Sequence, residues 1–134
     1  MGADDDQSKS PGGGETVVVV DDELIRNIVS RMLVTAGYDV ITAEDGPAAL
    51  AAVEGHHGKI DLLISDVVMP GMNGRLLVDR LRVAFPAMKA IFMSGHSDDT
   101  ILRYGIRDTG AAVLRKPFVR DTLLRTVREV IDSG

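Results

Sequence analysis

Apolar residues gather along the chain in short stretches that polar and glycine-rich segments separate. The stretch TVVVV at 16–20 is β-branched throughout and almost entirely apolar, as a strand covered on both faces should be. Four later stretches have a similar length and a similar apolar content. The pattern predicts strands over 16–20, 38–43, 60–65, 89–94 and 111–115.

Between these stretches, apolar residues recur every three or four positions, the spacing that puts them on one side of a helix. The first such segment ends at Gly37, which suits a helix C-cap. The last has a predicted buried side made of Leu123, Leu124, Val127, Val130 and Ile131. The spacing predicts helices over 23–37, 46–55, 74–85, 98–109 and 120–132.

Strands and helices therefore alternate along the chain. This order indicates an α/β fold in which a five-stranded parallel sheet carries helices on both faces. Ligands of such sheets bind beyond the carboxyl ends of the strands, at the point where the strand order reverses. The residues that follow each strand are therefore the first place to look for chemistry.

The composition suits one globular domain and excludes several classes of function. The chain has 134 residues, of which 45% are hydrophobic and 26% are charged. A formal net charge of −5 argues against binding to nucleic acid, which favours a basic surface. The absence of cysteine excludes disulfides, zinc–thiolate sites and thiol catalysis.

The first residues differ from the rest of the chain. Residues 1–15 hold almost no apolar side chains, so they cannot offset their ordering entropy by burial. We expect a disordered tail or linker over 1–15 and a domain over 16–134. No apolar run approaches the roughly 20 residues of a membrane span, and no secretory signal is visible, so we expect a cytoplasmic protein without membrane contact.

Charged and polar residues stand where four of the predicted strands end. Asp21 and Asp22 follow the first strand, Asp66 the third, Ser94 the fourth and Lys116 the fifth. Neighbouring first and third strands would bring three carboxylates together, which is unfavourable unless a cation joins them. Mg²⁺ fits best, because it takes one or two carboxylates together with waters and phosphate oxygens.

The same residues are the parts needed to carry a phosphoryl group on an aspartate. Asp66 would act as the nucleophile. The metal ion, the Ser94 hydroxyl and the Lys116 ammonium would neutralise charge on the phosphoryl oxygens. The strand ends therefore predict a phosphoryl-accepting site.

Four motifs carry a resemblance to a known family. They are VVVVDDE at 17–23, LLISDVVMPGMNG at 62–74, FMSGHSD at 92–98 and RKPF at 115–118. In this order and spacing, the chain from about 16 to 131 resembles the receiver domain of two-component response regulators. The resemblance implies a flavodoxin-like doubly wound (βα)5 fold with strand order 2-1-3-4-5.

The resemblance also implies roles for individual residues. Asp66 would be the phosphoacceptor, with Ser94 and Lys116 as phosphoryl contacts. Asp22, Asp66 and the backbone carbonyl of Val68 would be direct Mg²⁺ ligands, and Asp21 would act through water. A cis bond before Pro117 is common in the family.

The implied partner is a histidine kinase or a histidine phosphotransfer domain, whose phosphohistidine would supply the phosphate. FMSGHSDD and the glycine-rich lead-in look most like receivers attached to hybrid sensor kinases, which would make residues 1–15 an interdomain linker. The domain itself would be no enzyme beyond its own phosphorylation and slow dephosphorylation.

Two positions concern the output and the lifetime of the phosphate. The family often has Tyr or Phe three residues before the lysine, as a ring that turns inward on phosphorylation. This chain has Val113 there, and a short, stiff side chain cannot make that movement. We also hypothesise that His96 and Val68 influence phosphate lifetime, which the dephosphorylation rate of His96→Ala would test.

Taken singly, several of these residues also suit structural roles. Asp21 and Asp22 suit helix capping, and Asp66 and Lys116 suit exposed positions. Gly71 and Gly74 are expected to serve turn geometry. Six arginines leave open a solvated surface or a face on which the fourth and fifth helices contact a second copy or a target protein: Arg103, Arg107, Arg115, Arg120, Arg125 and Arg128.

Two other functions compete with the phosphoacceptor. Phosphatases of the haloacid dehalogenase group resemble one another in a second Asp two positions after the nucleophile, where this chain has Leu24 and Val68. That difference favours a phosphate that is held. A degenerate receiver that only binds partners would not need the full set of Asp21, Asp22, Asp66, Ser94 and Lys116.

Overall fold

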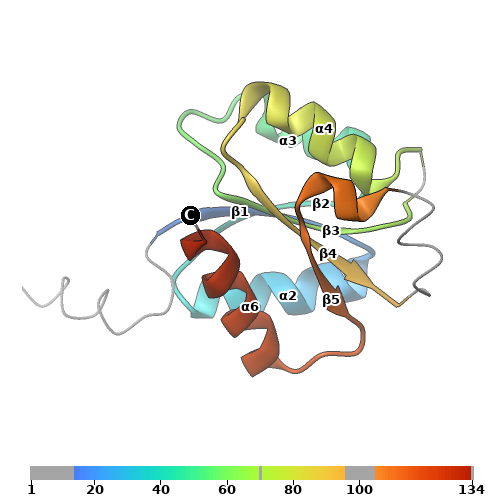
Figure 1. Cartoon of the computed structure of the whole chain (residues 1–134). Coiled ribbons are helices and arrows are strands. Elements are labelled where there is room, and N and C mark those ends of the chain that lie inside the picture. Colours follow the sequence, from blue (N-terminus) through green and yellow to red (C-terminus); the bar gives the residue numbers. More distant parts are fainter. Residues whose placement is uncertain (1–13, 70, 96–104, 134) are drawn as a thin grey trace, which may run out of the picture.

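A computed structural model describes residues 14–69, 71–95 and 105–133 (Figure 1). All neighbouring strands in its single sheet pair in parallel, in the order β2-β1-β3-β4-β5. The doubly wound fold and the strand order are therefore confirmed. The strands are β1 (Thr16–Val20), β2 (Asp39–Ala43), β3 (Leu62–Asp66), β4 (Lys89–Ser94) and β5 (Ala112–Arg115).

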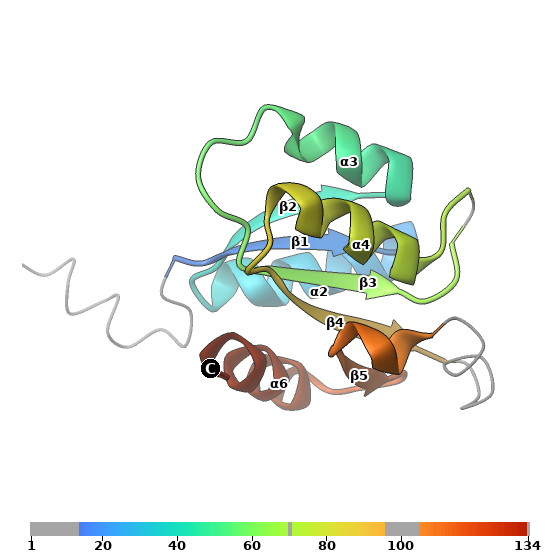
Figure 2. The same cartoon turned by 45° about the horizontal axis from the view of Figure 1, so that its top comes forward.

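Helices cover both faces of this sheet. Figure 2 shows α3 and α4 on one face and α2 and α6 on the other. None of the helices in the described ranges has both the length and the apolar character needed to cross a bilayer. The helical elements are α2 (Glu23–Thr35), α3 (Gly46–Glu54), α4 (Gly74–Ala84), the 3-10 helix η1 (Ile106–Thr109) and α6 (Arg120–Asp132).

Alternation of side chains along β1 divides the core into two layers. Val18 and Val20 pack under α3 and α4, whereas Val17 and Val19 pack under α2 and α6. All four are fully buried, because helices cover both faces of a central strand. This burial explains why the sequence of β1 shows an unbroken apolar run.

Three polar side chains begin three of the helices at the carboxyl edge of the sheet. Asp22 accepts a hydrogen bond from the backbone N–H of Ile25 at 3.0 Å. Asp45 and Asn73 accept equivalent bonds from Ala48 at 2.8 Å and Leu76 at 2.9 Å. Such N-caps satisfy backbone donors that a helix start leaves unpaired. They therefore fix α2, α3 and α4 at the edge where the site is expected.

Several predicted boundaries differ from the structure. The third strand begins at Leu62, two residues later than predicted, and includes Asp66. Of the predicted fourth helix, residues 98–104 lie outside the described ranges, and residues 106–109 form a 3-10 turn. On the predicted buried side of α6, Leu123, Leu124 and Val127 are buried, while Val130 and Ile131 are partly exposed.

Candidate functional site

Four of the predicted site residues lie at the ends of neighbouring strands. Asp21 follows β1, Asp66 ends β3, Ser94 ends β4 and Lys116 follows β5. Asp66 is paired in register with Met93, and Ser94 with Arg115, so these ends are level across the sheet. The parallel order thus places all four residues along one rim, which we call the acidic rim.

Lys116 connects the acidic residues of this rim. Its Nζ lies 3.0 Å from Asp21 Oδ2 and 3.6 Å from Asp66 Oδ2. Its backbone N–H donates to the Ser94 carbonyl at 2.9 Å, which ties the end of β5 to the end of β4. The peptide bond between Lys116 and Pro117 is cis, as the resemblance implied. Lys116 therefore places one positive charge between two carboxylates.

Asp21 is the most deeply buried charged group of the rim, with 1% of its surface exposed. Burial raises the pKa of its carboxyl group, because the charged form loses its hydration. The backbone N–H of Asp22, which donates to Asp21 Oδ1 at 2.7 Å, and the Lys116 ammonium both oppose this rise. Negative charge here is thus only partly compensated by the protein.

Two carboxylate oxygens of the rim are left for a further cation. Within the described ranges, buried Asp66 Oδ1 has no hydrogen-bond partner, and buried Asp21 Oδ2 has the ion pair with Lys116 but no hydrogen bond. The unpartnered Asp66 Oδ1 atom calls for an explanation, and Mg²⁺ prefers hard oxygen donors such as carboxylates. The residues present therefore fit this ion.

The three expected carboxylates differ in exposure: Asp21 is buried, Asp66 is partly exposed and Asp22 is exposed. No group of three His, Cys, Asp or Glu side chains in the described part of the chain is arranged to hold a metal. Asp22 is exposed and points a carboxylate oxygen at the start of α2, so its interpretation as a helix cap is confirmed. Val68, whose carbonyl was the other expected ligand, is 38% exposed after β3.

Two glycines shape the loop that follows Asp66. Gly71 has φ +79°, a left-handed conformation that confirms its predicted turn role. Gly74 has no positive φ and is the first residue of α4, so the predicted turn role is wrong for it. A Cβ atom at Gly74 would lie 2.5 Å from the Phe92 ring and 2.6 Å from the Asp66 carbonyl oxygen. Gly74 is needed because α4 starts directly against the acidic rim.

The other singled-out positions are less informative. Ser94 is fully buried at the end of β4. Val113 is half-buried and packs against the apolar layer that contains Phe92. His96 lies outside the described residues.

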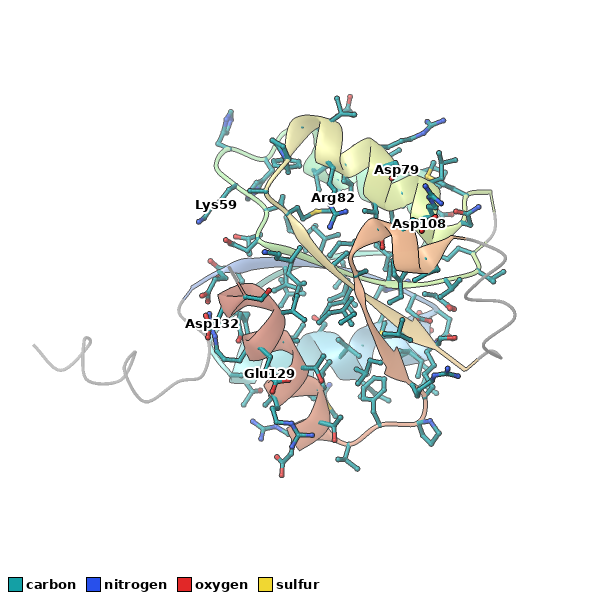
Figure 3. All side chains as sticks on the ribbon, viewed as in Figure 1. Lys59, Asp79, Arg82, Asp108, Glu129 and Asp132 are labelled. Atoms are coloured by element: carbon teal, nitrogen blue, oxygen red, sulfur yellow. The ribbon has the colours of Figure 1, made fainter. Side chains whose placement is uncertain are left out.

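Two arginines of α4 make contacts that no pattern in the sequence predicts. Arg75 donates to the Gly105 carbonyl at 3.3 Å and forms ion pairs with Asp79 and Asp108, which Figure 3 labels. Arg82, also labelled there, donates to the Thr109 carbonyl at 2.7 Å. These bonds join α4 to the segment around η1. Their partners are too far apart in sequence for a local residue pattern to predict them.

Arg128 of α6 is also more than a solvated residue. It donates to Glu15 Oε2 and Asp132 Oδ1 at 2.8 Å each, and to the Tyr38 hydroxyl at 3.4 Å. These contacts join α6 to the residue that precedes β1 and to the residue that precedes β2. For Arg128, the interpretation as a freely solvated surface residue is wrong.

Comparison with known proteins identifies the family of this chain. Residues 17–128 match the model of the response regulator receiver domain. Sensor kinase CckA of Brucella abortus is 39% identical over 113 residues, which cover 84% of this chain and 12% of that protein. The transcriptional regulator NtrC of Salmonella typhimurium is 34% identical over 83% of this chain and 23% of its own length. The chain thus spans a minor part of these relatives.

Solved structures show the same fold. The chemotaxis response regulator CheY4 of Vibrio cholerae is 35% identical, with a TM-score of 0.76 over 87% of this chain and 98% of that one. Receiver domains of this kind act in two-component signalling, interact with histidine kinases and typically bind Mg²⁺. With the acidic rim on the matching fold, the chain belongs to the response regulator receiver domain family.

Proposed function

We propose that this domain takes a phosphoryl group from a phosphohistidine onto Asp66. The observation that carries the proposal is the placement of the Lys116 ammonium 3.6 Å from Asp66 Oδ2 and 3.0 Å from Asp21 Oδ2. A cation beside the acceptor offsets the charge that the incoming phosphoryl group brings. The Asp66 side chain is partly exposed at the end of β3, so a donor can reach it.

The proposed step is a displacement at phosphorus. An Asp66 carboxylate oxygen forms a bond to phosphorus while the bond from phosphorus to the histidine nitrogen of the donor breaks. The histidine leaves with the electron pair and takes up a proton. Lys116 holds the phosphoryl oxygens, and the Ser94 hydroxyl donates to one of them.

Asp22, Asp66 and the backbone carbonyl of Val68 would hold the Mg²⁺ ion directly, and Asp21 would act through water. When bound, the ion supplies electrostatic stabilisation of charge on the phosphoryl oxygens. Asp66 Oδ1, which has no hydrogen-bond partner among the described residues, supports this assignment. In the proposal, His96 and Val68 influence how long the phosphate survives.

A face of α2 supports docking of the phosphodonor next to the rim. Leu24 is 68% exposed and Ile28 is 41% exposed, although both are apolar. They line a groove of about 400 Å³ together with Arg31 and Arg120. Because α2 starts immediately after Asp22, a helical partner lying on this face has its phosphohistidine close to Asp66. We therefore propose a histidine kinase or histidine phosphotransfer domain as that partner.

We propose that the domain relays phosphate without turning over a separate substrate, and that it is located in the cytoplasm. The relation to CckA favours a receiver within a hybrid kinase, with residues 1–15 as linker and 16–134 as the domain. For the output, we still predict that a second copy or a target protein contacts the helices predicted over 98–109 and 120–132.

Mass spectrometry after incubation with acetyl phosphate tests this function. We expect the chain to gain one phosphoryl group with Mg²⁺ present, and neither with EDTA nor in Asp66→Asn. Rapid release of inorganic phosphate would instead indicate a phosphatase. Absence of any added mass, or equal phosphorylation of Asp66→Asn, would leave only a binding module and overturn the proposal.

A further inference from the structure

The outer side of α3 is unusually apolar for a surface helix. Its sequence, GPAALAAVE, contains a single charged residue in nine. A helix with one face in solvent normally carries charged or polar residues there. Here Pro47, Ala51 and Ala52 are the exposed residues, with only Glu54 to solvate that side. Such a helix indicates that something else covers it.

A groove runs between α3 and α4, which lie side by side on the same face of the sheet (Figure 2). It has a volume of about 850 Å³. Next to it on α4, Leu76 is 39% exposed and Val83 is 86% exposed. The apolar surface therefore extends over both helices. The main apolar lining residues are Leu50, Ala51, Met72, Leu81, Ala84 and Phe85.

The two helices that form the groove contribute opposite charges to it. Glu54 lies on α3 and Arg80 on α4, and both are exposed. Neither forms an ion pair with any residue that the structure describes. One acid and one base on opposite sides of an apolar groove make this face complementary to itself.

We propose that the groove between α3 and α4 binds a second copy of this chain about a two-fold axis. In a two-fold contact, residue i of one copy meets residue j of the other, and the reverse pair forms as well. Glu54 of each copy would then meet Arg80 of the other, and the apolar sides of the two α3 helices would cover each other. Both exposed charges and the apolar surface are accounted for by this arrangement.

The groove on α2 shows why a second copy fits the α3–α4 face in particular. That groove carries Arg31 and Arg120 and no acidic residue, so two copies of it would repel each other. Its lining residues come mainly from α2, which covers the opposite face of the sheet (Figure 2). The proposed contact thus leaves the acidic rim and the face of α2 open to a phosphodonor, and it does not depend on the proposed phosphorylation.

Charge reversal on the two sides of the groove tests the proposal. In sedimentation equilibrium of the full chain, we expect a monomer–dimer equilibrium. Glu54→Arg and Arg80→Glu should each raise the dimer Kd at least about tenfold, because each places like charges opposite one another. Combining both substitutions in one chain should restore the wild-type Kd, since the pairs reform with reversed signs.

A mixture of the two single variants gives the sharpest result. One chain then carries Arg at both positions and the other Glu at both, so a heterodimer should form while neither variant pairs with itself. Glu129→Arg on α6, a matched charge reversal on the other face (Figure 3), should leave the Kd unchanged. Far-ultraviolet circular dichroism checks that every variant is folded.

Three outcomes would overturn the proposal. They are a wild-type chain that stays monomeric, a dimer that both single variants retain, and a mixture that forms no heterodimer. A monomeric chain that binds an amphipathic helical peptide in this groove would identify a different occupant. Phosphorylation of Asp66 in the monomeric variants separates this result from the proposed function, which they should retain.

Discussion

At the scale of single residues, the acidic rim contains a buried charge that lowers the stability of the fold. Asp21 is buried, and its pKa is raised by burial. Its Oδ2 atom has an ion pair but no hydrogen bond from the described residues. A neutral residue would be easier to bury there. We interpret this cost as the consequence of keeping an oxygen available for a cation.

Replacing Asp21 by asparagine should therefore stabilise the metal-free protein. The amide oxygen can still accept the N–H of Asp22, while the buried charge is removed. We expect the free energy of unfolding to rise by about 1 kcal/mol in EDTA, measured by urea denaturation at neutral pH. Phosphorylation by acetyl phosphate should fall in the same variant. A less stable Asp21→Asn protein would show that the ion pair with Lys116 outweighs the burial cost.

At the scale of elements, the start of α4 depends on a contact between distant parts of the chain. The Gly74 N–H donates to the Val67 carbonyl at 2.8 Å, and the Asn73 side chain caps the helix. This arrangement leaves no space for a side chain between Gly74, Phe92 and the Asp66 carbonyl. Helix α4 and strand β3 are thus in contact through their backbones beside the site.

Gly74→Ala should destabilise the fold by about 1–3 kcal/mol, because its methyl group must displace the Phe92 ring or the Asp66 backbone. Gly55→Ala is the matched control, since a Cβ atom there meets nothing within 4 Å. Thermal or urea unfolding of both variants measures the difference. Equal stability of the two variants would contradict the close approach at Gly74.

The contrast at Gly74 also shows which parts could be predicted from sequence. The strands, most of the helices and the strand-end residues could be predicted, because apolar runs and helical spacing are visible within a few neighbouring positions. The space at Gly74, the bonds from Arg75 and Arg82 to the segment around η1, and the position of Lys116 between two carboxylates join elements far apart in the chain. Such contacts leave no periodic signal.

At the scale of the whole molecule, Tyr38 and Arg128 connect segments that are 90 residues apart. Tyr38 is 3% exposed, and burial raises the pKa of its hydroxyl group. The neutral phenol is thus favoured in the folded protein. The unfolded chain releases this proton first, at a pH of about 10, so the stability that Tyr38 contributes is complete below that pH.

We expect the free energy of unfolding to fall as the pH rises through the folded pKa of Tyr38, and to fall less in Tyr38→Phe. Tyr104→Phe removes the other of the two tyrosines, so the ultraviolet absorbance of tyrosinate then reports Tyr38 alone. Titration of Tyr38 at or below the pH of a free tyrosine would refute this expectation. Comparison with Tyr38→Phe removes the effects of lysine and arginine titration.

The contacts of Arg128 determine where the domain would be connected to the rest of a longer polypeptide. They hold Glu15, where the chain enters β1, against the last turn of α6. Figure 1 shows both ends of the folded part at the same pole, and the carboxyl ends of the strands point to the other pole. Both ends of the described fold therefore lie at the pole opposite the acidic rim. The acidic rim, where we propose that phosphorylation occurs, faces away from both junctions, so a phosphodonor can approach it there.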